Sequence, residues 1–392
     1  MPQRTNRPRV IIVTRSVDRA STSGSGHHQR EMVRHLIPQA DDLDILLAHY
    51  QHSDDEIYRM APDFVLPLGP LRAARVLNRY RPDVVHFSPL SMWAPIHGLG
   101  AKKVATIHSA EPIMLPEGYS LAARLHERLV APRYARAMDV VCTVSEASKR
   151  WFAEHFLIDM ERMIVTYNAC APAYRVLDPE QDRLRNPDDP PVDTPFILHV
   201  SRFSLRKNPW TMLEAFARVV TRQSGVTGQP LSLVLAGSGW NNPEIQRRAR
   251  ERGIAERIHL PGFVSEDTVV RLMNRAEVFW FPSLSEGFGM PNIEAMTCGC
   301  PVVTSAVHAI PEIVGDAAVV LDDPRDVEAL ASETERILTS PGWRADLVER
   351  GLERARRYDW NASAHALANC YRRLTGLPER AAPVISSGYH TS

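Results

Sequence analysis

Two glutamates separated by seven residues, Glu286 and Glu294, mark the segment whose residue types could do the most chemistry. An apolar run ends at Phe281, a glycine-containing loop follows, and a short helix then begins that Gly299 can terminate. The backbone N–H groups at the start of such a helix, at residues 287–292, have no partner within the helix. The segment therefore predicts an anion site that suits a phosphate.

Carboxylates repel a phosphate, so Glu286 and Glu294 fit this site only if each contacts a hydroxyl-bearing part of the same ligand. A ligand with a diphosphate in the middle, a sugar at one end and a ribose at the other meets all three requirements. The alternative is structural, with one glutamate as a helix cap and the other as a solvated helical residue.

A second segment with chemical potential follows another predicted strand. Ser201, Arg202 and Lys207 come directly after the strand, and Asn208 and Pro209 suit the N-cap and first position of the next helix. Only four of the 46 basic residues are lysines, which singles out Lys207. Since ligands bind at the carboxyl ends of strands in open α/β sheets, the two cations could hold a diphosphate. A basic surface loop is the alternative.

Two glycine turns later in the chain allow a ligand to approach the backbone closely. Gly237 follows a predicted strand, and Val264 follows the turn of Gly262. A short glycine loop by itself is weak evidence for a site.

The N-terminal half contributes a smaller set of candidates. Gly24 and Gly26 lie in a loop between the first predicted strand and a helix, and His108 follows a later strand where its side chain would point into a cleft. The loop lacks the full G-x-G-x-x-G spacing and an acidic ribose ligand, which counts against dinucleotide binding. For His108, a structural histidine is the alternative.

The stretch 121–136 is both basic and apolar, with leucines at Leu121, Leu125 and Leu129 and several arginines. It could rest against anionic lipid. A solvated helix with its leucines on the core is the alternative.

Alternating short apolar runs and amphipathic stretches must position these residues, and this alternation is typical of βαβ units with a parallel sheet. Two helical faces are clear, one at residues 212–220 and one at 269–276. The predicted strands are Val10–Thr14, Val84–Phe87, Val104–Ile107, Val140–Val144, Phe196–Val200, Leu231–Ala236, Val278–Phe281 and Pro301–Thr304.

A chain of 392 residues exceeds what one core usually organises, so two α/β domains are expected. Residues 172–195 are proline-rich and aperiodic, which indicates a linker. We predict an N-terminal domain at 1–175, a linker at 176–194 and a C-terminal domain at 195–374, with 375–392 returning to the N-terminal domain.

The composition limits partners and location. Basic and acidic residues balance at 46 each, which argues against nucleic-acid binding. Five cysteines without metal-ligand spacing suit a reducing compartment. The first apolar run, residues 10–13, is too short for a signal peptide or a membrane span, so a cytoplasmic protein is expected.

The C-terminal segments together resemble the retaining glycosyltransferases of family 4, also called group 1. Residues 286–294 resemble the family's E-x7-E motif, and Ser201, Arg202 and Lys207 resemble its diphosphate clamp. The resemblance implies an α/β fold of the GT-B type, with two Rossmann-like domains facing across a cleft. The last helix, around residues 360–374, would cross back to the N-terminal domain.

The N-terminal half resembles the family less closely. Ser23 stands where the family's glycine pair begins, and Asn168-Ala169 replaces a common Asn-Gly. This half would bind the acceptor, while the C-terminal half would bind the nucleotide sugar.

The resemblance also implies individual roles. Arg202 and Lys207 would hold the diphosphate, Glu294 the ribose and Glu286 the transferred sugar, and His108 would face that sugar from the other domain. His108 and Glu286 are thus the catalytic candidates. The donor-binding candidates are Gly24, Gly26, Ser201, Arg202, Lys207, Gly237, Val264, Phe288, Gly289, Met290 and Glu294.

The implied reaction retains anomeric configuration and uses neither an enzymic nucleophile, a metal nor another cofactor. A likeness of residues 281–323 to bacterial polysaccharide mannosyltransferases favours GDP-mannose as the donor. The alternatives are a UDP-sugar-dependent glucosyl- or N-acetylglucosaminyltransferase, a sugar-nucleotide epimerase of the same fold, and a non-catalytic nucleotide-binding module or nicotinamide oxidoreductase.

The acceptor stays open among a polysaccharide or other glycan, a lipid-linked glycan and a small molecule. Peripheral contact with the inner face of a membrane is compatible with each of them.

Overall fold

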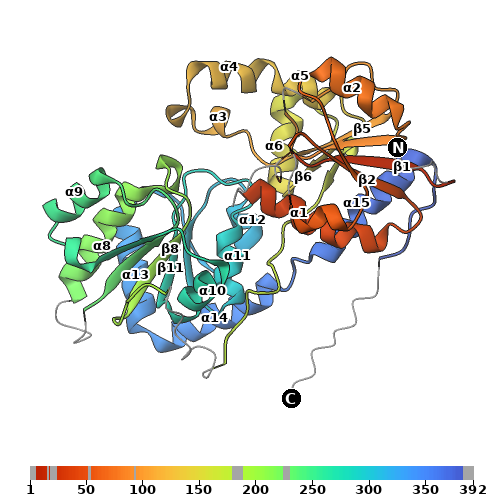
Figure 1. Ribbon diagram of the computed structural model, residues 1–392. Coiled ribbons are helices and arrows are strands. Elements are labelled where there is room, and N and C mark those ends of the chain that lie inside the picture. Colours follow the sequence, from red (N-terminus) through yellow and green to blue (C-terminus); the bar gives the residue numbers. More distant parts are fainter. Residues whose placement is uncertain are drawn as a thin grey trace.

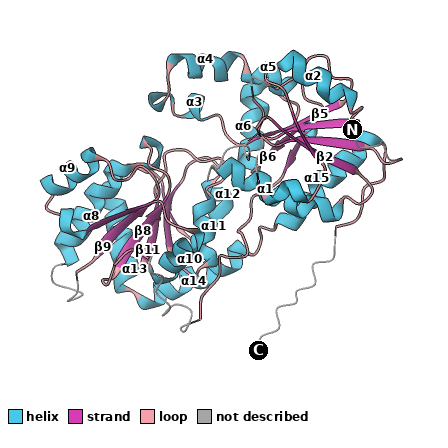
Figure 2. Ribbon diagram, in the orientation of Figure 1, coloured by secondary structure: helices cyan, strands magenta, loops and turns pink. Residues whose placement is uncertain are grey.

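Two parallel β-sheets, one in each half of the chain, organise the molecule (Figure 1). The computed structural model describes residues 6–15, 17, 24–51, 54–91, 94–178, 189–223 and 230–382. Figure 2 shows each sheet lying between layers of helices. The predicted α/β fold with two Rossmann-like domains is confirmed.

The N-terminal sheet has seven strands in the order β3-β2-β1-β4-β5-β6-β7. All of its strand pairs are parallel. Its strands are β1 (Arg9–Val13), β2 (Asp44–His49), β3 (Asp63–Val65), β4 (Val84–Phe87), β5 (Lys102–Ile107), β6 (Val140–Thr143) and β7 (Met163–Val165).

The C-terminal sheet has six parallel strands in the order β10-β9-β8-β11-β12-β13. Its strands are β8 (Phe196–Val200), β9 (Ser232–Ala236), β10 (Ile258–Gly262), β11 (Val278–Phe281), β12 (Val302–Ser305) and β13 (Val319–Leu321).

Helices connect the strands in both halves. The N-terminal half contains α1 (Gly24–Leu36), α2 (Pro70–Arg79), α3 (Glu111–Met114), α4 (Leu121–Leu129), α5 (Ala131–Arg136) and α6 (Glu146–Phe156). The C-terminal half contains α8 (Pro209–Gln223), α9 (Pro243–Glu251), α10 (Glu266–Arg275), α11 (Met290–Thr297), α12 (Ile310–Val314), α13 (Val327–Thr339), α14 (Pro341–Ala355) and α15 (Trp360–Thr375). Short 3-10 helices are η1 (Ile37–Gln39), η2 (Glu56–Arg59), η3 (Pro116–Gly118), η4 (Met160–Arg162), η5 (Leu205–Lys207) and η6 (Ala255–Arg257).

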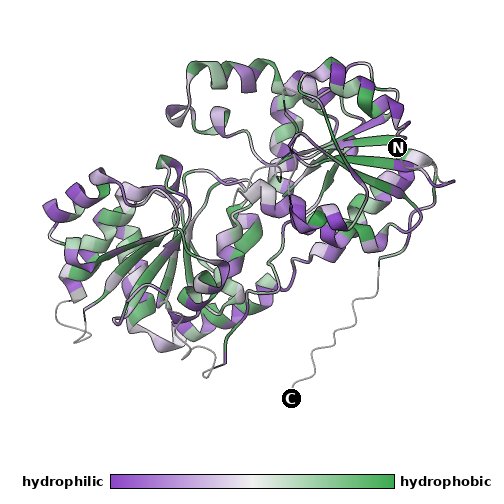
Figure 3. Cartoon of the chain, in the orientation of Figure 1, coloured by the Kyte–Doolittle hydropathy of each residue, from purple (hydrophilic) through white to green (hydrophobic). Residues whose placement is uncertain are grey.

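The strands read as continuous apolar runs because both faces of each sheet are covered, as the green strands in Figure 3 show. In β1, Val10 and Ile12 pack toward α1 and α15, whereas Ile11 and Val13 pack toward α2, α5 and α6. In the C-terminal domain, α8, α9 and α13 cover one face and α10, α11 and α12 the other.

The chain crosses back to the N-terminal domain at α15, as the family resemblance implies. Asp359 caps this helix by accepting a hydrogen bond from the Asn361 N–H. Trp360 and Tyr371 are buried in the N-terminal core, and the Tyr371 hydroxyl lies 2.5 Å from His86 Nδ1 of β4. The return therefore begins at residue 360, earlier than the predicted boundary at 375, because the apolar face of α15 belongs to this core.

The predicted linker at 176–194 is described only at its ends, since residues 179–188 lie outside the described part of the chain. On the C-terminal side, Asp189 forms a two-oxygen ion pair with Arg271 of α10. Leu177 and Val192 pack against the C-terminal core, so both described ends attach to that domain.

None of the helices in the described residues combines the length and the apolar character that a membrane span requires. All five cysteines are free thiols.

Candidate active site

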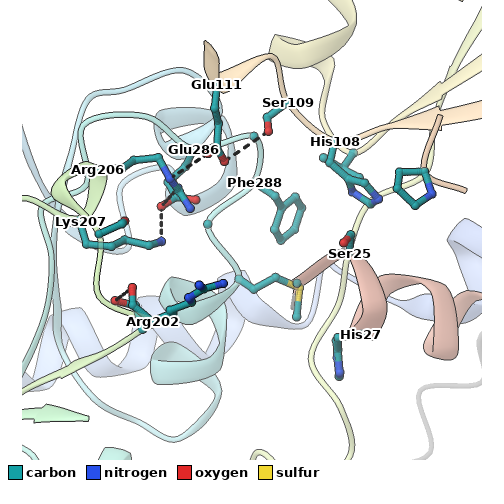
Figure 4. A pocket seen from close by; sticks show the side chains of 18 of the residues that line it. Ser25, His27, His108, Ser109, Glu111, Arg202, Arg206, Lys207, Glu286 and Phe288 are labelled. Carbon is teal, nitrogen blue, oxygen red and sulfur yellow. Dashed lines mark hydrogen bonds and ion pairs between the residues drawn. The ribbon is translucent and has the colours of Figure 1, made fainter. Parts of the chain in front are cut away.

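A cleft of about 1620 Å³ lies between the two domains, at the carboxyl ends of both sheets. Twelve of the thirteen predicted site residues line it, and Gly26 does not. Figure 4 shows Arg202, Arg206, Lys207 and Glu286 on one side of the cleft and Ser25, His27 and His108 on the other. The cleft thus brings together residues that are widely separated in the sequence.

Glu286 is held by two cations and a hydroxyl that all bond to one of its oxygens. Its Oε1 accepts from Lys207 Nζ at 2.5 Å and from Ser283 Oγ at 2.8 Å, and Arg206 Nη1 lies at 2.6 Å. The other oxygen, Oε2, has no hydrogen-bond partner among the described residues. Glu286 therefore keeps one acceptor atom available to a ligand in the cleft.

Burial and the neighbouring charges have opposite effects on the pKa values of Glu286 and Lys207. Burial alone would raise the pKa of Glu286, but Lys207 and Arg206 outweigh it and lower that pKa to about 2. Burial lowers the pKa of Lys207, and Glu286 opposes that shift. Glu286 is a carboxylate at neutral pH, and Glu111 adds a second carboxylate 3.4 Å from Arg206 Nε, so the two cations of this cluster face two carboxylates.

The start of α11 adds backbone donors to this site. Gly289 adopts a left-handed conformation with φ of 84°, which places the loop before the helix close to the cleft. Within the described residues, the N–H groups of Phe288, Gly289 and Met290 have no hydrogen-bond partner. The geometry supplies the anion site that the sequence predicted.

Glu294 lies on α11 and lines the cleft. Burial, and then the nearby Glu266, raise the pKa of Glu294 to about 8. Its carboxyl is therefore largely protonated at pH 7, which lets it both donate and accept hydrogen bonds with hydroxyl groups.

Other predicted donor residues surround this centre. Arg202 is exposed, and its guanidinium forms no ion pair with a described carboxylate. The Ser201 hydroxyl is already engaged, because it lies 2.7 Å from His199 Nε2. Gly237 must be glycine, since a Cβ there would lie 2.0 Å from the Ser201 carbonyl oxygen. Val264 lines the cleft beside Phe263, whose ring is 65% exposed.

The N-terminal candidates differ in their placement. Gly24 and Gly26 lie in the first turn of α1 rather than in a loop, and only Gly24 reaches the cleft. Gly26 is buried inside the helix packing. The predicted loop residue Ser23 lies outside the described residues.

His108 lies in the cleft wall with its ring packed edge-on against His28, at 4.8 Å between ring centroids. Burial and the proximity of His28 lower the pKa of His108 well below its ordinary value, so the ring is neutral. Its Nε2 is buried and has no hydrogen-bond partner among the described residues. His108 thus carries a buried ring nitrogen without a partner in the cleft wall.

Direct contacts join the domains behind the cleft. Glu312 of α12 accepts hydrogen bonds from the backbone N–H groups of Glu146 and Ala147, at 2.8 and 2.6 Å, and so caps α6 from the other domain. The hydroxyls of Ser145 and Ser148 donate to the Gly287 carbonyl at 3.0 and 3.2 Å. The loop that carries Glu286 is therefore anchored to the N-terminal domain.

Sequence reasoning missed three cleft residues. Arg206 precedes Lys207 in a loop where any polar residue would look ordinary, and Glu111, 3.4 Å from Arg206 Nε, comes from the other domain. Phe263 had a signal, since an apolar residue directly after a glycine turn is a candidate for contact with a ligand. Asn208 directly precedes α8, as predicted for an N-cap, and its Oδ1 accepts from the Thr211 hydroxyl. Its Nδ2 also donates to the carbonyls of Pro282 and Pro324.

Comparisons with known proteins extend over both domains. Residues 22–173 match the family model described as Glycosyltransferase Family 4, and residues 180–354 match the model described as Glycosyl transferases group 1. O-antigen chain mannosyltransferase B of Escherichia coli is 30% identical over 315 residues, which cover 78% of each chain.

Two further matches are more distant. The serotype-specific mannosyltransferase WbdA of Escherichia coli is 25% identical over 307 residues, which cover 75% of this chain but only 37% of WbdA. The structure of sucrose-phosphate synthase from Thermosynechococcus elongatus superposes with a TM-score of 0.75 at 21% identity, covering 94% of this chain and all of the other. The structural match supports the fold alone.

Both halves of the chain thus match glycosyltransferase family models, and a relative of similar extent is a mannosyltransferase. The chain belongs to the family 4, or group 1, glycosyltransferases and is a hexose-transferring enzyme of the GT-B fold.

Proposed function

We propose that the protein transfers mannose from GDP-mannose to a hydroxyl acceptor with retention of anomeric configuration. The observation that carries the proposal is the cluster of Lys207, Arg206 and Glu286 at the start of α11, because it combines a diphosphate site with a free carboxylate oxygen. The preference for mannose rests on the two mannosyltransferases of Escherichia coli among the relatives.

In this proposal the donor spans the cleft along the C-terminal domain. Lys207 and Arg202 bind the diphosphate together with the N–H groups before α11, and Glu294 binds the ribose hydroxyls. Glu286 presents Oε2 to the hydroxyls of the mannose, and His108 Nε2 faces the same sugar from the other domain. Each charge-assisted contact contributes about 1.5–3 kcal/mol.

The same geometry argues against a covalent intermediate on Glu286. One oxygen of this carboxylate carries three donors, and a pKa of about 2 makes the group a weak nucleophile. In the proposed step the bond from the anomeric carbon to the phosphate oxygen breaks while the acceptor oxygen attacks from the same face. The acceptor proton passes to the leaving phosphate oxygen, and the cations stabilise the charge that develops there.

The proposed enzyme needs no metal, because Lys207 and Arg202 supply the positive charge. We place it in the cytoplasm with nucleotide sugar and acceptor as its partners. The acceptor is a glycan, a lipid-linked glycan or a small hydroxyl compound.

A thermal-shift titration with GDP, UDP and ADP tests the donor, since a ligand that binds only the native state stabilises it by RT ln(1 + [L]/Kd). We expect a GDP-selective shift that the Lys207→Ala variant loses. A UDP-selective shift would redirect the proposal to a glucosyl- or N-acetylglucosaminyltransferase. No shift with any nucleotide would overturn it.

Two activity measurements complete the test. Conversion of GDP-mannose without any acceptor would favour an epimerase instead. With an acceptor, NMR of the product must show the same anomeric configuration as the donor, and an inverted product would refute retention.

A further inference from the structure

Helices α3 and α4 form a part of the cleft wall that the donor assignment does not use. α4 packs on α3, and Figure 1 shows both at the edge of the N-terminal domain that faces the C-terminal domain. The leucines of α4, at Leu121, Leu125 and Leu129, are exposed instead of packing on the core. A different side of the helix brings His126 and Glu127 into the cleft.

Glu127 is a largely buried carboxyl group that no described residue satisfies. Its side chain is 17% exposed, and its contact with His126 is 3.9 Å long, between Oε2 and Nδ1. This distance exceeds that of a hydrogen bond, and Glu127 forms no hydrogen bond within the described residues. Burial raises the pKa of Glu127 to about 7. Since buried polar groups are normally hydrogen-bonded, this carboxyl points to a ligand that supplies donors.

His126 contributes a second polar group of the same kind. Its ring lines the cleft, and its Nε2 is buried without a hydrogen-bond partner in the described part of the chain. An imidazole can donate through one nitrogen and accept through the other. Glu127 and His126 together therefore suit hydroxyl groups, which both donate and accept.

Tyr119 connects these residues with the donor side of the cleft. Its hydroxyl donates to Glu111 Oε2. Glu111 lies 3.4 Å from Arg206 Nε, and Arg206 in turn contacts Glu286, as Figure 4 shows. Burial, and then the hydrogen bond to Glu111, raise the pKa of Tyr119, and the charge of Glu127 adds to this shift. Tyr119 thus lies within electrostatic range of Glu127 and only a short chain of contacts from Glu286.

We propose that Glu127, His126 and Tyr119 form an acceptor subsite that binds the uncharged hydroxyls of a sugar residue. Glu127 and His126 would exchange hydrogen bonds with these hydroxyls, and the ring of Tyr119 would pack on the apolar face of the sugar. The inference rests on the proposed glycosyl transfer. It narrows the acceptor to compounds whose reacting sugar carries no phosphate.

The charges on this wall favour an uncharged sugar over a phosphorylated one. Glu111 and Glu127 both line the wall, and a phosphate beside them would be repelled. Among the described cleft residues of the N-terminal domain, the arginines and lysines are represented by Arg30, which is paired with Asp55. A phosphorylated sugar would therefore meet carboxylates there and no free guanidinium or ammonium group.

Saturation-transfer NMR with small sugars tests the subsite without any turnover. The probes are the methyl glycosides of mannose, glucose, galactose and N-acetylglucosamine, compared with mannose 6-phosphate and glucose 6-phosphate at pH 8 in the presence of GDP. We expect at least one methyl glycoside to bind and both phosphates to bind more weakly. Absence of binding by every methyl glycoside, or tighter binding of a phosphate, would overturn the proposal.

Two substitutions at Glu127 sharpen the test. Glu127→Gln keeps the shape but removes the charge, and it should weaken binding of the methyl glycoside about tenfold. Glu127→Lys reverses the charge and should make a sugar phosphate bind more tightly than the methyl glycoside. Glu117→Gln, an exposed change in η3 outside the cleft, is the control and should bind like the unmodified protein. Unchanged glycoside binding in Glu127→Gln would also overturn the proposal.

Thermal shifts with GDP separate this proposal from the proposed function. A GDP shift that persists in Glu127→Gln, together with weakened glycoside binding, would support both. A glycoside that binds through Glu127 to a protein without any nucleotide shift would support the subsite and reject the donor assignment. A GDP shift without glycoside binding would support the donor assignment and reject the subsite.

Discussion

Glu286 is paired with cations through one carboxylate oxygen and keeps the other oxygen for a ligand. Lys207, Arg206 and Ser283 all bond to Oε1, which fixes the orientation of the carboxylate and leaves Oε2 toward the cleft. Arg206 does not need to touch the donor for this purpose, so we regard it as a positioning residue.

Arg206→Ala should reduce turnover about 10–100-fold while changing GDP affinity by less than about threefold, because a misplaced carboxylate affects the sugar more than the nucleotide. Kinetics with the sugar donor and titration with GDP measure the two effects. Arg206→Lys should restore part of the turnover.

Arg218→Ala, which removes an exposed ion pair with Glu328, is the control and should leave both quantities unchanged. A parallel loss of GDP affinity and turnover in Arg206→Ala would contradict a positioning role.

Glu294 should make the stability of the empty enzyme depend on pH. Its folded-state pKa of about 8 exceeds the ordinary value of 4.5, so the folded state binds more protons between these values. The stability that Glu294 contributes is therefore present at low pH and lost as the pH rises through 8. As the pH rises from 5 to 8.5, the free energy of unfolding of Glu294→Gln should increase by roughly 1–3 kcal/mol relative to that of the unmodified protein.

Urea unfolding at several pH values measures this difference. Glu353→Gln alters an exposed glutamate of α14. The difference in free energy of unfolding between this variant and the unmodified protein should not change with pH. If the difference for Glu294→Gln is also independent of pH, the Glu294 carboxyl is already ionised at neutral pH.

The sequence could predict those site residues whose spacing has a local physical meaning. The separation of Glu286 and Glu294 reflects a helix start with a carboxylate on each side, and both line the cleft. Glu111 could not be found in this way, because its contact with Arg206 spans two domains. Roles assigned through the family resemblance, such as ribose binding by Glu294, stay predictions.

At the scale of elements, the loop before α11 is shaped by contact with the opposite domain. A Cβ at Gly287 would lie 2.2 Å from the His108 carbonyl oxygen. The absence of a side chain at 287 thus sets how closely the two walls of the cleft approach.

Gly287→Ala should lower turnover about 100-fold by separating the two walls, since displacements of about 1 Å can cost this much. Small-angle scattering should show a more open molecule. Gly342→Ala in α14 is the control, because a Cβ there meets nothing within 4 Å. Normal turnover in Gly287→Ala would show that the walls can adjust without loss.

All eight strands predicted from the sequence are present, with ends shifted by at most two residues. The strands that were not predicted are β2, β3, β7, β10 and β13, of which all but β2 lie at the edges of the sheets. β2 is internal and contains an apolar run at residues 45–48, so its sequence did carry a strand signal. β3 has only three residues, and β10 contains Pro261 and Gly262, which are typical of turns. β3 and β10 are not fully buried, so they lack the continuous apolar runs that reveal central strands.

At the scale of the whole molecule, Glu312 connects the domains through the start of α6. Its carboxylate accepts two backbone N–H groups of the N-terminal domain and the Tyr167 hydroxyl at 3.0 Å. A carboxylate in this position also interacts favourably with the helix dipole.

Glu312→Gln should destabilise the joined domains by about 1–2 kcal/mol, the usual contribution of a helix cap and its charge. Thermal unfolding measures the stability, and small-angle scattering measures the expected opening. Glu256→Gln, an exposed change in the C-terminal domain, should have no effect on either. An unchanged radius of gyration for Glu312→Gln would show that Glu312 does not hold the two domains together.

The crossing helix α15 also affects how the protein is made. Trp360, Leu367 and Tyr371 complete the N-terminal core, so a nascent chain cannot finish that core until this helix has emerged from the ribosome. The C-terminal sheet, by contrast, draws on residues 196–321 and can assemble earlier. The first half of the chain to be synthesised is thus the last to be completed, and its exposed strands must avoid aggregation while translation continues.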